Sequence, residues 1–508
     1  MRRTLLSIAL LVAAGCGGGG AATFGPDKVQ IPVSDGVRAK AKKAAPARQQ
    51  PPPSGEAKEA PFPAVARSTL ANGMGVAVVR SETLPIVQIR VLVRAGSGYG
   101  PSPGIAELTG QMLKDGGTKA LASNELLRRV ETLGANLSVD TDFDSTVLSM
   151  AVTKEQLGEA LSLLSQVVRE PRFDGRELAK LKARATDEAE DAARSSGAWT
   201  ATWLVFRETF PDKHPYQSFG LLPAQIAKVD GAAVRDFHRR FYVPKATTLV
   251  LAGDVDEATA KTVAEKHFGS WSGGEPPKVD IGDPRPPATT RVIVAHRPKS
   301  VQSDVYVAML APERTSDRWP HVRVANQVLG GGVASRLFTD VREQRSLAYR
   351  TSAQIFELAR GKQPLVVYAG TQTGKTAEAV AGLLENLEKM TSSPPTASET
   401  ETARRYLSDV FALRMETIGA IGDMVVTQDT FGLPDGYWDR YRKELRATEA
   451  GEAAGAAKDL YRPDQALVVV AGDADVIGPE LARFGPVTVV DPEREFRTLR
   501  TLPKAGDR

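Results

Sequence analysis

Polar and apolar residues alternate in some stretches of the chain and recur at helical spacing in others. From Val87 to Val93 every second residue is apolar, a period of two that predicts a strand with one buried face and one solvated face. Elsewhere, apolar residues stand three and four positions apart, which is the spacing of amphipathic helices. The helical sets are Leu126, Val130, Leu133 and Leu137, followed by Leu157, Leu161, Leu164 and Val168. Because strands and helices do not alternate as regular βαβ units, we expect an α+β fold.

One segment of the chain occurs twice, at an offset of 219 residues. Tyr242-Val243-Pro244 precedes an apolar run that ends in Gly253-Asp254, and Tyr461-Arg462-Pro463 precedes a similar run that ends in Gly472-Asp473. Each copy predicts a buried strand that is entered through a proline. We therefore expect two homologous halves, at 63–275 and 288–498, with a proline- and glycine-rich linker at 276–287 and a tail at 499–508.

Further elements follow from local patterns in the two halves. Asn72-Gly73 is a hairpin-turn signal in the first half. In the second half we expect a strand at Val301–Leu310, a helix around Val322–Val328, and paired strands near Ala348–Phe356 and Leu365–Thr371.

The first sixteen residues have the three parts of an export signal. Arg2 and Arg3 are basic, residues 5–14 are apolar, and Ala13-Ala14-Gly15-Cys16 is a cleavage site of small residues. The segment resembles a bacterial lipoprotein signal, so we expect residues 1–16 to be a signal peptide and Cys16 to be lipidated. Ordinary signal-peptide cleavage is the alternative.

The segment 17–62 is rich in Gly, Ala, Pro and Lys and has few large apolar residues. Such a composition predicts a disordered tether. We therefore expect a lipid-anchored protein at the periplasmic face of the cell envelope. Gly17 stands where a retention signal often has aspartate, which favours the outer membrane.

Composition excludes several classes of protein. The 508 residues are 42% hydrophobic and 25% charged, so the chain can bury several cores and is not disordered throughout. The 65 Lys and Arg against 61 Asp and Glu leave a net charge of +4, which is too small for a phosphate-binding surface and argues against nucleic acid as a partner. A single cysteine cannot form an internal disulfide. No stretch after the signal is long and uncharged enough to span a bilayer.

Four sequence blocks resemble those of the pitrilysin/insulinase (M16) metallopeptidases. The blocks are Asn72-Gly73 with Arg94–Ser97, Gly104–Leu108 through Gly117-Thr118, His214-Pro215-Tyr216, and Leu329–Phe338 with Arg342-Glu343 and Leu347–Tyr349. The resemblance is strongest to the smaller bacterial members and to the mitochondrial processing peptidase subunits. It implies two halves of the LuxS/mitochondrial processing peptidase-like metallohydrolase fold, which form a clamshell cleft for a peptide.

The zinc motif of that family is degenerate in this chain. Members that cleave peptides carry His-x-x-Glu-His on a helix, where two imidazoles bind zinc and the glutamate takes a proton from the zinc-bound water. The corresponding positions here are Glu107, Gly110 and Gln111, and Glu188 is the counterpart of a distant glutamate ligand. We therefore expect no metal on this chain. No two of the five histidines stand four residues apart, and we expect His214 to shape a loop.

The second half retains another element of the family. In related enzymes an arginine and a tyrosine at the places of Arg342 and Tyr349 bond substrate carbonyls and the developing oxyanion, from the half opposite the zinc. A guanidinium and a phenol are strong donors for such an oxygen. The alternative is structural: Arg342 pairs with a nearby carboxylate, and Tyr349 packs under the glycine loop Gly330–Gly332.

A chain without the zinc triad but with this pair resembles the non-catalytic subunit of a split zinc peptidase. It would be inactive alone and would support a partner that carries His-x-x-Glu-His and the zinc, acting on a peptide or an unfolded protein. A stand-alone lipid-anchored module for peptide binding or assembly, without proteolysis, is the second hypothesis. An active peptidase with unorthodox ligands is the third.

Overall fold

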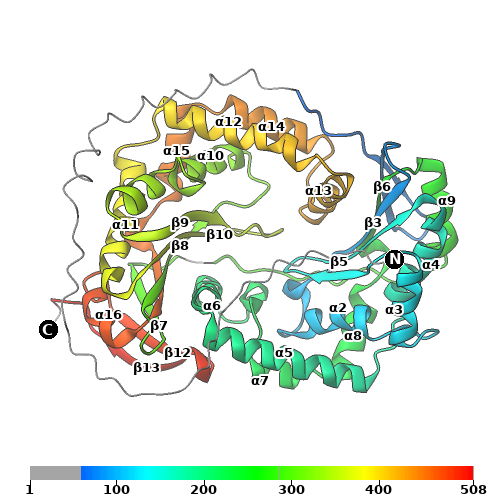
Figure 1. The fold of residues 1–508 in the computed structure, drawn as a ribbon, viewed down its shortest axis with the longest axis horizontal. Helices are drawn as coiled ribbons and strands as arrows, with labels where there is room; N and C mark the ends of the chain where they lie inside the picture. The colour runs from blue at the N-terminus through cyan, green and yellow to red at the C-terminus, as the bar shows by residue number, and fades with distance from the viewer. Residues whose placement is uncertain (1–58, 285, 507–508) are drawn as a thin grey trace, which may run out of the picture. The chain divides into compact units, whose positions relative to one another are not determined.

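Two mixed β-sheets organise the chain, one in each of the expected halves (Figure 1). The computed structural model describes residues 59–284 and 286–506. The expected signal peptide with Cys16, and all but the last few residues of the expected tether, lie outside the described residues. Within the described part, none of the helices combines the length and the apolar character that a membrane crossing requires. The expected α+β class is confirmed.

The first sheet has six strands in the order β1-β2-β6-β3-β5-β4. Strand β6 is parallel to β2 and antiparallel to β3. The strands are β1 Ala66–Thr69, β2 Gly75–Arg80, β3 Ile86–Val93, β4 Ser138–Thr141, β5 Thr146–Thr153 and β6 Thr247–Gly253. The helices of this half are α2 Ile105–Asp115, α3 Ser123–Thr132, α4 Leu157–Arg169, α5 Gly175–Ser195, α6 Gly197–Thr209, α7 Pro223–Lys228, α8 Gly231–Phe241 and α9 Glu257–Phe268.

The second sheet has seven strands in the order β13-β12-β7-β11-β8-β10-β9. The strands are β7 Arg291–His296, β8 Gln302–Ala311, β9 Ala348–Ile355, β10 Gln363–Gln372, β11 Leu467–Gly472, β12 Val487–Asp491 and β13 Arg497–Leu502. The helices are α10 Trp319–Gly330, α11 Thr376–Ser392, α12 Ala397–Arg414, α13 Ile418–Thr430, α14 Tyr437–Ala447, α15 Ala450–Leu460 and α16 Ala474–Leu481. The strands and the helix expected in this half are confirmed.

The sequence repeat is a structural repeat. Helices α8 and α15 begin and end at residues that are 219 positions apart, and each is followed by a proline-led turn and a central strand. The strand β11 is parallel to β7 and antiparallel to β8, as β6 is to β2 and β3. The two halves therefore share one topology around their central strands.

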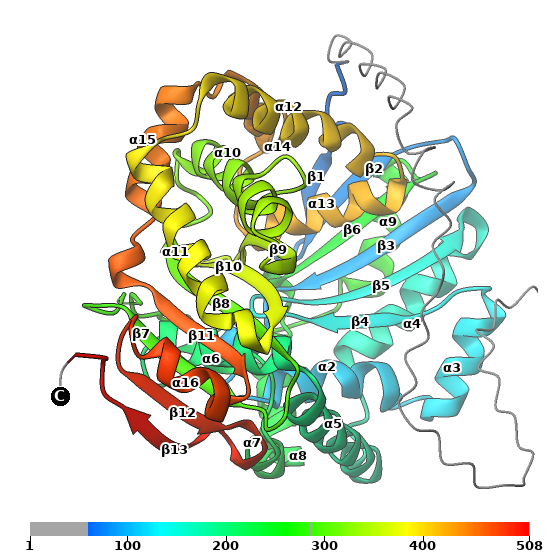
Figure 2. The ribbon, with the colours of Figure 1, turned by 60° about the vertical axis from the view of Figure 1, so that its left-hand side comes forward.

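Each sheet is covered on one face by a helix from the other half. Helix α13 packs on β3 and β6 (Figure 2), where Ile421, Val425 and Val426 join an apolar cluster with Leu92 and Val250. Helix α6 packs in the same way on β8 and β11. Apolar burial on these faces joins the halves.

This exchange corrects the expected solvated face of strand β3. Leu92 is fully buried, and Arg90 is buried with its Nε donating to Asp423 of α13 at 2.8 Å. The period of two is present, but the polar positions contact a helix that is more than 300 residues away in sequence. The expectation was wrong because the pattern of a strand does not show what covers its second face.

Two further expectations about boundaries change. Helix α3 ends at Thr132, because Gly134 has a φ of +66°, so Leu137 is buried beyond the helix. Strand β13 runs to Leu502 and pairs with β12, which places its last residues inside the expected tail. The expected linker 276–287 contains no helix or strand in its described residues.

Candidate functional site

Helix α2 carries the residues at the degenerate zinc positions and packs beside strand β4. Glu107 and Gln111 stand one helical turn apart. One oxygen of each, Glu107 Oε2 and Gln111 Oε1, is enclosed and has no hydrogen-bond partner among the described residues. Burial raises the pKa of Glu107 to about 7, and hydrogen bonding to the backbone at Glu107 and Gly104 opposes that rise. Glu107 is thus half protonated near neutral pH.

The space beside Gly110 is filled by a side chain from the first sheet. A Cβ atom added at Gly110 would lie 2.2 Å from Thr141 Oγ1. That hydroxyl is 3.1 Å from Thr146 Oγ1, which donates to the carbonyl oxygen of Ala95 at 2.9 Å. A glutamate at position 110 would therefore collide with Thr141, so β4 has adapted to the glycine.

Glu188 does not complete a metal site with these residues. It lies exposed on α5, and its carboxylate is 3.7 Å from Arg184 Nε. Arg184 also lies 3.4 Å from Asp115 at the end of α2. The four positions offer no imidazole or thiolate, and zinc sites in proteins are built from such groups. These residues do not fit a zinc ion.

Arg342 and Tyr349 lie at the surface of the second half. Arg342 is exposed on the π-helical segment Phe338–Gln344, with its guanidinium carbon 4.6 Å from the centre of the Phe338 ring. In the described part of the chain, no carboxylate lies within ion-pair distance of Arg342. Tyr349 is 57% exposed near the start of β9. The structural alternative for Arg342, a nearby ion pair, is not what the structure shows.

A β-bulge sets the direction of Tyr349. In the pairing of β9 with β10, Arg350 faces Gly370 and Ala348 faces Thr371, so Tyr349 has no residue opposite it. A bulged strand turns a side chain out of the regular alternation. Accordingly, Tyr349 and its neighbour Arg350 are both exposed.

The ring of Tyr349 lies against Gly370 of the neighbouring strand. A Cβ atom at Gly370 would be 2.9 Å from Tyr349 Cζ and 2.7 Å from Tyr368 Oη. Tyr368 in turn donates a hydrogen bond of 2.8 Å to Asp304. Burial, together with that bond and the nearby charge of Asp304, raises the pKa of the Tyr368 phenol, so Tyr368 stays a donor. Gly370 thus provides the space in which the phenol of Tyr349 is held, and the sequence alone gave no sign of this.

The His214-Pro215-Tyr216 block connects the two halves. His214 Nδ1 accepts from the backbone N–H of Tyr216 at 3.1 Å, and Nε2 is 2.8 Å from the Gly282 carbonyl oxygen in the linker. Burial lowers the pKa of His214. The expected role in shaping a loop is confirmed. Tyr216 donates to Asp144 at 2.5 Å, and Arg360 from the second half reaches both.

Sequence reasoning missed a group at the end of the repeated strand. His296, Asp473 and Asp475 place ligand-type atoms within 4.8 Å of one another, the one such group of three among residues 59–284 and 286–506. His296 Nδ1, however, accepts from the backbone N–H of Ala474 at 3.1 Å, and Asp475 pairs with Arg500. In the first half, Arg80 occupies the place of His296 in the strand register. The group therefore repeats a cluster of charged side chains.

Comparison with known proteins places these features in a family. Residues 75–202 match the family described as Insulinase (Peptidase family M16), and residues 228–407 match the Peptidase M16 inactive domain. The chain is 24% identical over 412 residues to the uncharacterized zinc protease YmxG of Bacillus subtilis, covering 80% of this chain and 98% of that protein. It is 24% identical over 379 residues to the non-peptidase homolog YmxG of Helicobacter pylori, covering 72% and 84%.

A solved structure shows the same fold. The crystal structure of a peptidase M16 inactive domain from Pseudomonas fluorescens has a TM-score of 0.75 and 24% identity, and the match covers 80% of this chain and 98% of that one.

Proposed function

Since the chain belongs to the peptidase M16 family, we propose that it is the non-catalytic subunit of a zinc peptidase in the cell envelope. The zinc and the motif His-x-x-Glu-His belong to a partner chain of the same family. This chain contributes a surface that holds a peptide substrate, and by itself it does not cleave peptides.

One contrast carries the proposal. On α2, a glycine packed against Thr141 stands where the catalytic glutamate would be. On β9, a bulge and the space at Gly370 support an exposed Tyr349. A chain that had lost all function would have no reason to keep an unpartnered phenol held in one direction while the metal positions are rebuilt.

In this proposal Arg342 and Tyr349 donate hydrogen bonds to the substrate carbonyl beside the partner's zinc. Their donors stabilise negative charge as it develops on that oxygen. The name of the Helicobacter pylori relative, a non-peptidase homolog, supports the existence of such members.

The test begins with affinity purification of the protein from its native membranes and identification of the chains that co-purify. With the partner in hand, Arg342→Ala and Tyr349→Phe should each lower kcat about 10²–10³-fold without loss of assembly. Arg440→Ala on α14 and Tyr406→Phe on α12 are matched controls, because both residues are exposed and lie on other elements. Full activity of both variants, or the absence of any M16 partner, would favour the module for peptide binding without proteolysis.

The anchor is a separate part of the proposal. We propose that Cys16 is lipidated and that the segment 17–62 tethers the protein to a membrane, with the outer membrane favoured. Cys16→Ser should move the protein from the membrane fraction to a soluble or unprocessed form. Native protein that is free of membranes in the wild-type strain would contradict the anchor but not the peptidase subunit.

A further inference from the structure

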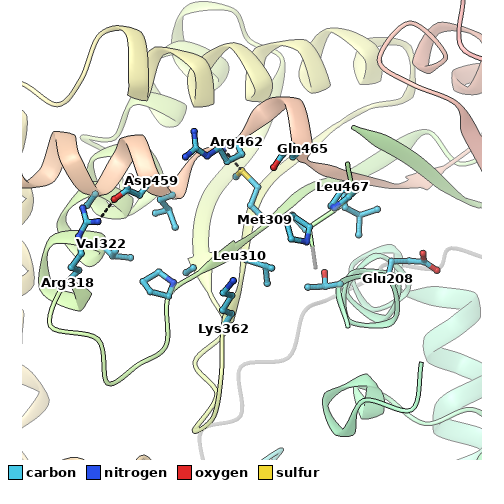
Figure 3. Close-up of a pocket in the computed structure, with 18 residues that line it drawn as sticks. Glu208, Met309, Leu310, Arg318, Val322, Lys362, Asp459, Arg462, Gln465 and Leu467 are labelled. Carbon is cyan, nitrogen blue, oxygen red and sulfur yellow. Dashed lines mark hydrogen bonds and ion pairs between the residues drawn. The ribbon is translucent and has the colours of Figure 1, made fainter. Parts of the chain in front are cut away.

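An apolar pocket of about 360 Å³ lies in the second half, where α10, α15, the end of β8 and the start of β11 meet (Figure 3). This volume is in the range of sites for small molecules. Its apolar wall includes Met309, Leu310, Val322, Ala456, Leu460 and Leu467. The pocket does not include any of the residues at the degenerate zinc positions, nor Arg342 or Tyr349.

The internal repeat shows that the first half fills the equivalent place with aromatic rings. At the offset of 219 residues, Ala456 and Leu460 of α15 correspond to Phe237 and Phe241 of α8. The rings of Phe237 and Phe241 are fully buried, with their centres 4.8 Å apart, and Phe241 also meets the ring of Tyr99. Two large side chains in one copy are thus two smaller ones in the other, and the second copy has a pocket.

A cation stands beside this pocket in place of a buried apolar residue. Arg462 corresponds to Val243 at the same offset; Val243 is buried, whereas Arg462 is exposed. Lys362, on the loop between β9 and β10, also lines the pocket and is exposed. Neither side chain has an ion pair within the described ranges.

The other charged groups that line the pocket are neutralised. Arg318 pairs with Asp459, and Glu208 lies 3.0 Å from Arg291. The pocket therefore combines an apolar interior with two unpaired positive charges, Lys362 and Arg462 (Figure 3). The complementary ligand is a molecule with an apolar body and one negative end.

We propose that this pocket binds a medium-chain fatty acid. The hydrocarbon chain lies against Met309, Leu460 and Leu467, and the carboxylate accepts hydrogen bonds from Arg462 and Lys362. A peptide is a poorer occupant, because Thr209 and Gln465 are the uncharged polar side chains among the lining residues, and unpaired peptide amides are costly in an apolar pocket.

Binding of decanoate to the purified full chain, measured by isothermal titration calorimetry, tests the proposal. We expect one site per chain and at least about tenfold weaker binding of decanol, which has the same chain length without the charge. Undetectable decanoate binding by the folded protein would overturn the proposal. So would equal affinity for decanol, or tighter binding of a short peptide with an apolar C-terminal residue.

The internal repeat supplies the variants. Ala456→Phe and Leu460→Phe each introduce the residue of the first half, and we expect either to abolish decanoate binding. If the ring occupies the pocket, the ligand-free variant should also unfold at a temperature a few degrees higher. Undiminished decanoate binding by both folded variants would show that the fatty acid binds elsewhere.

The charged end is tested separately. Arg462→Val, which again copies the first half, and Lys362→Gln should each weaken decanoate binding about tenfold. Lys458→Gln is the matched control, since Lys458 is an exposed cation on α15 that does not line the pocket. Equal affinities of wild type and both pocket variants would overturn the assignment of the carboxylate.

Discussion

Arg360 of the second half lies with its Nε 3.3 Å from the phenol oxygen of Tyr216 in the first half. The same guanidinium donates to the carbonyl oxygens of Gly98 and Val279, each at 3.0 Å. Tyr216 donates to the buried Asp144, whose other oxygen accepts from the backbone N–H of Ala359 at 2.7 Å. One loop of the second half is thus bonded to the first sheet, to the family block and to the linker.

Removal of this arginine should destabilise the whole fold. Arg360→Leu leaves Asp144 buried without its cation, and we expect a loss of about 2–4 kcal/mol in the free energy of unfolding. Urea denaturation measures the change, and Arg440→Leu on the exposed face of α14 should shift it by less than about 0.5 kcal/mol. Equal stability of the two variants would mean that the loop contact contributes nothing to joining the halves.

The pKa of Glu107 predicts a pH dependence of stability. Its pKa of about 7 in the folded state lies above the ordinary value of 4.5, so the folded state binds the proton more tightly. The stabilisation is fully present below about pH 4.5 and is lost as the pH rises through 7, by about 3 kcal/mol in all. Glu107→Gln should remove this part of the slope.

Unfolding free energies of wild type and Glu107→Gln, measured between pH 5 and pH 8, give the comparison. The variant should gain on the wild type as the pH rises. A difference that stays constant over this range would show that Glu107 remains ionised throughout.

Restoring the zinc motif should fail unless β4 is changed too. Glu107→His, Gly110→Glu and Gln111→His together place a side chain at position 110 against Thr141 Oγ1. We expect little zinc in the dialysed triple variant, and at least about tenfold tighter binding once Thr141→Ala is added. Thr141→Ala alone is the control. Stoichiometric zinc in the triple variant would show that Thr141 moves aside at little cost.

Gly370 should act through Tyr349. Gly370→Ala introduces a methyl group within 3 Å of two tyrosine rings, so the phenol of Tyr349 must move. In the complex with the partner, we expect kcat to fall about as far as in Tyr349→Phe. The double variant should be no worse than either single one. If the two losses multiply, Gly370 acts independently of the tyrosine.

The repeat and the order of elements could be predicted because they rest on local patterns. The copies that begin at Tyr242 and Tyr461 were recognisable from proline, glycine and apolar residues alone. The bulge at Tyr349 was not, because a run of eight strand residues does not show where its pairing with β10 shifts.

The surroundings of the candidate site depended on contacts between distant segments. The replacements at Glu107, Gly110 and Gln111 were visible in the sequence, but Thr141 in the space beside Gly110 was not. The pocket beside Ala456 was missed for the same reason, although a comparison of α8 with α15 residue by residue would have shown two phenylalanines replaced by smaller side chains.

The packing of α13 on the first sheet has a consequence for the nascent chain. The ribosome completes β6 at Gly253 long before it reaches Thr430, the last residue of α13. At bacterial rates of synthesis this leaves an interval on the order of ten seconds or more. During it, the apolar face that contains Ala77, Leu92 and Val250 has no helix to cover it. The emerging chain therefore needs a chaperone at this stage, and a fragment that stops before α13 would aggregate.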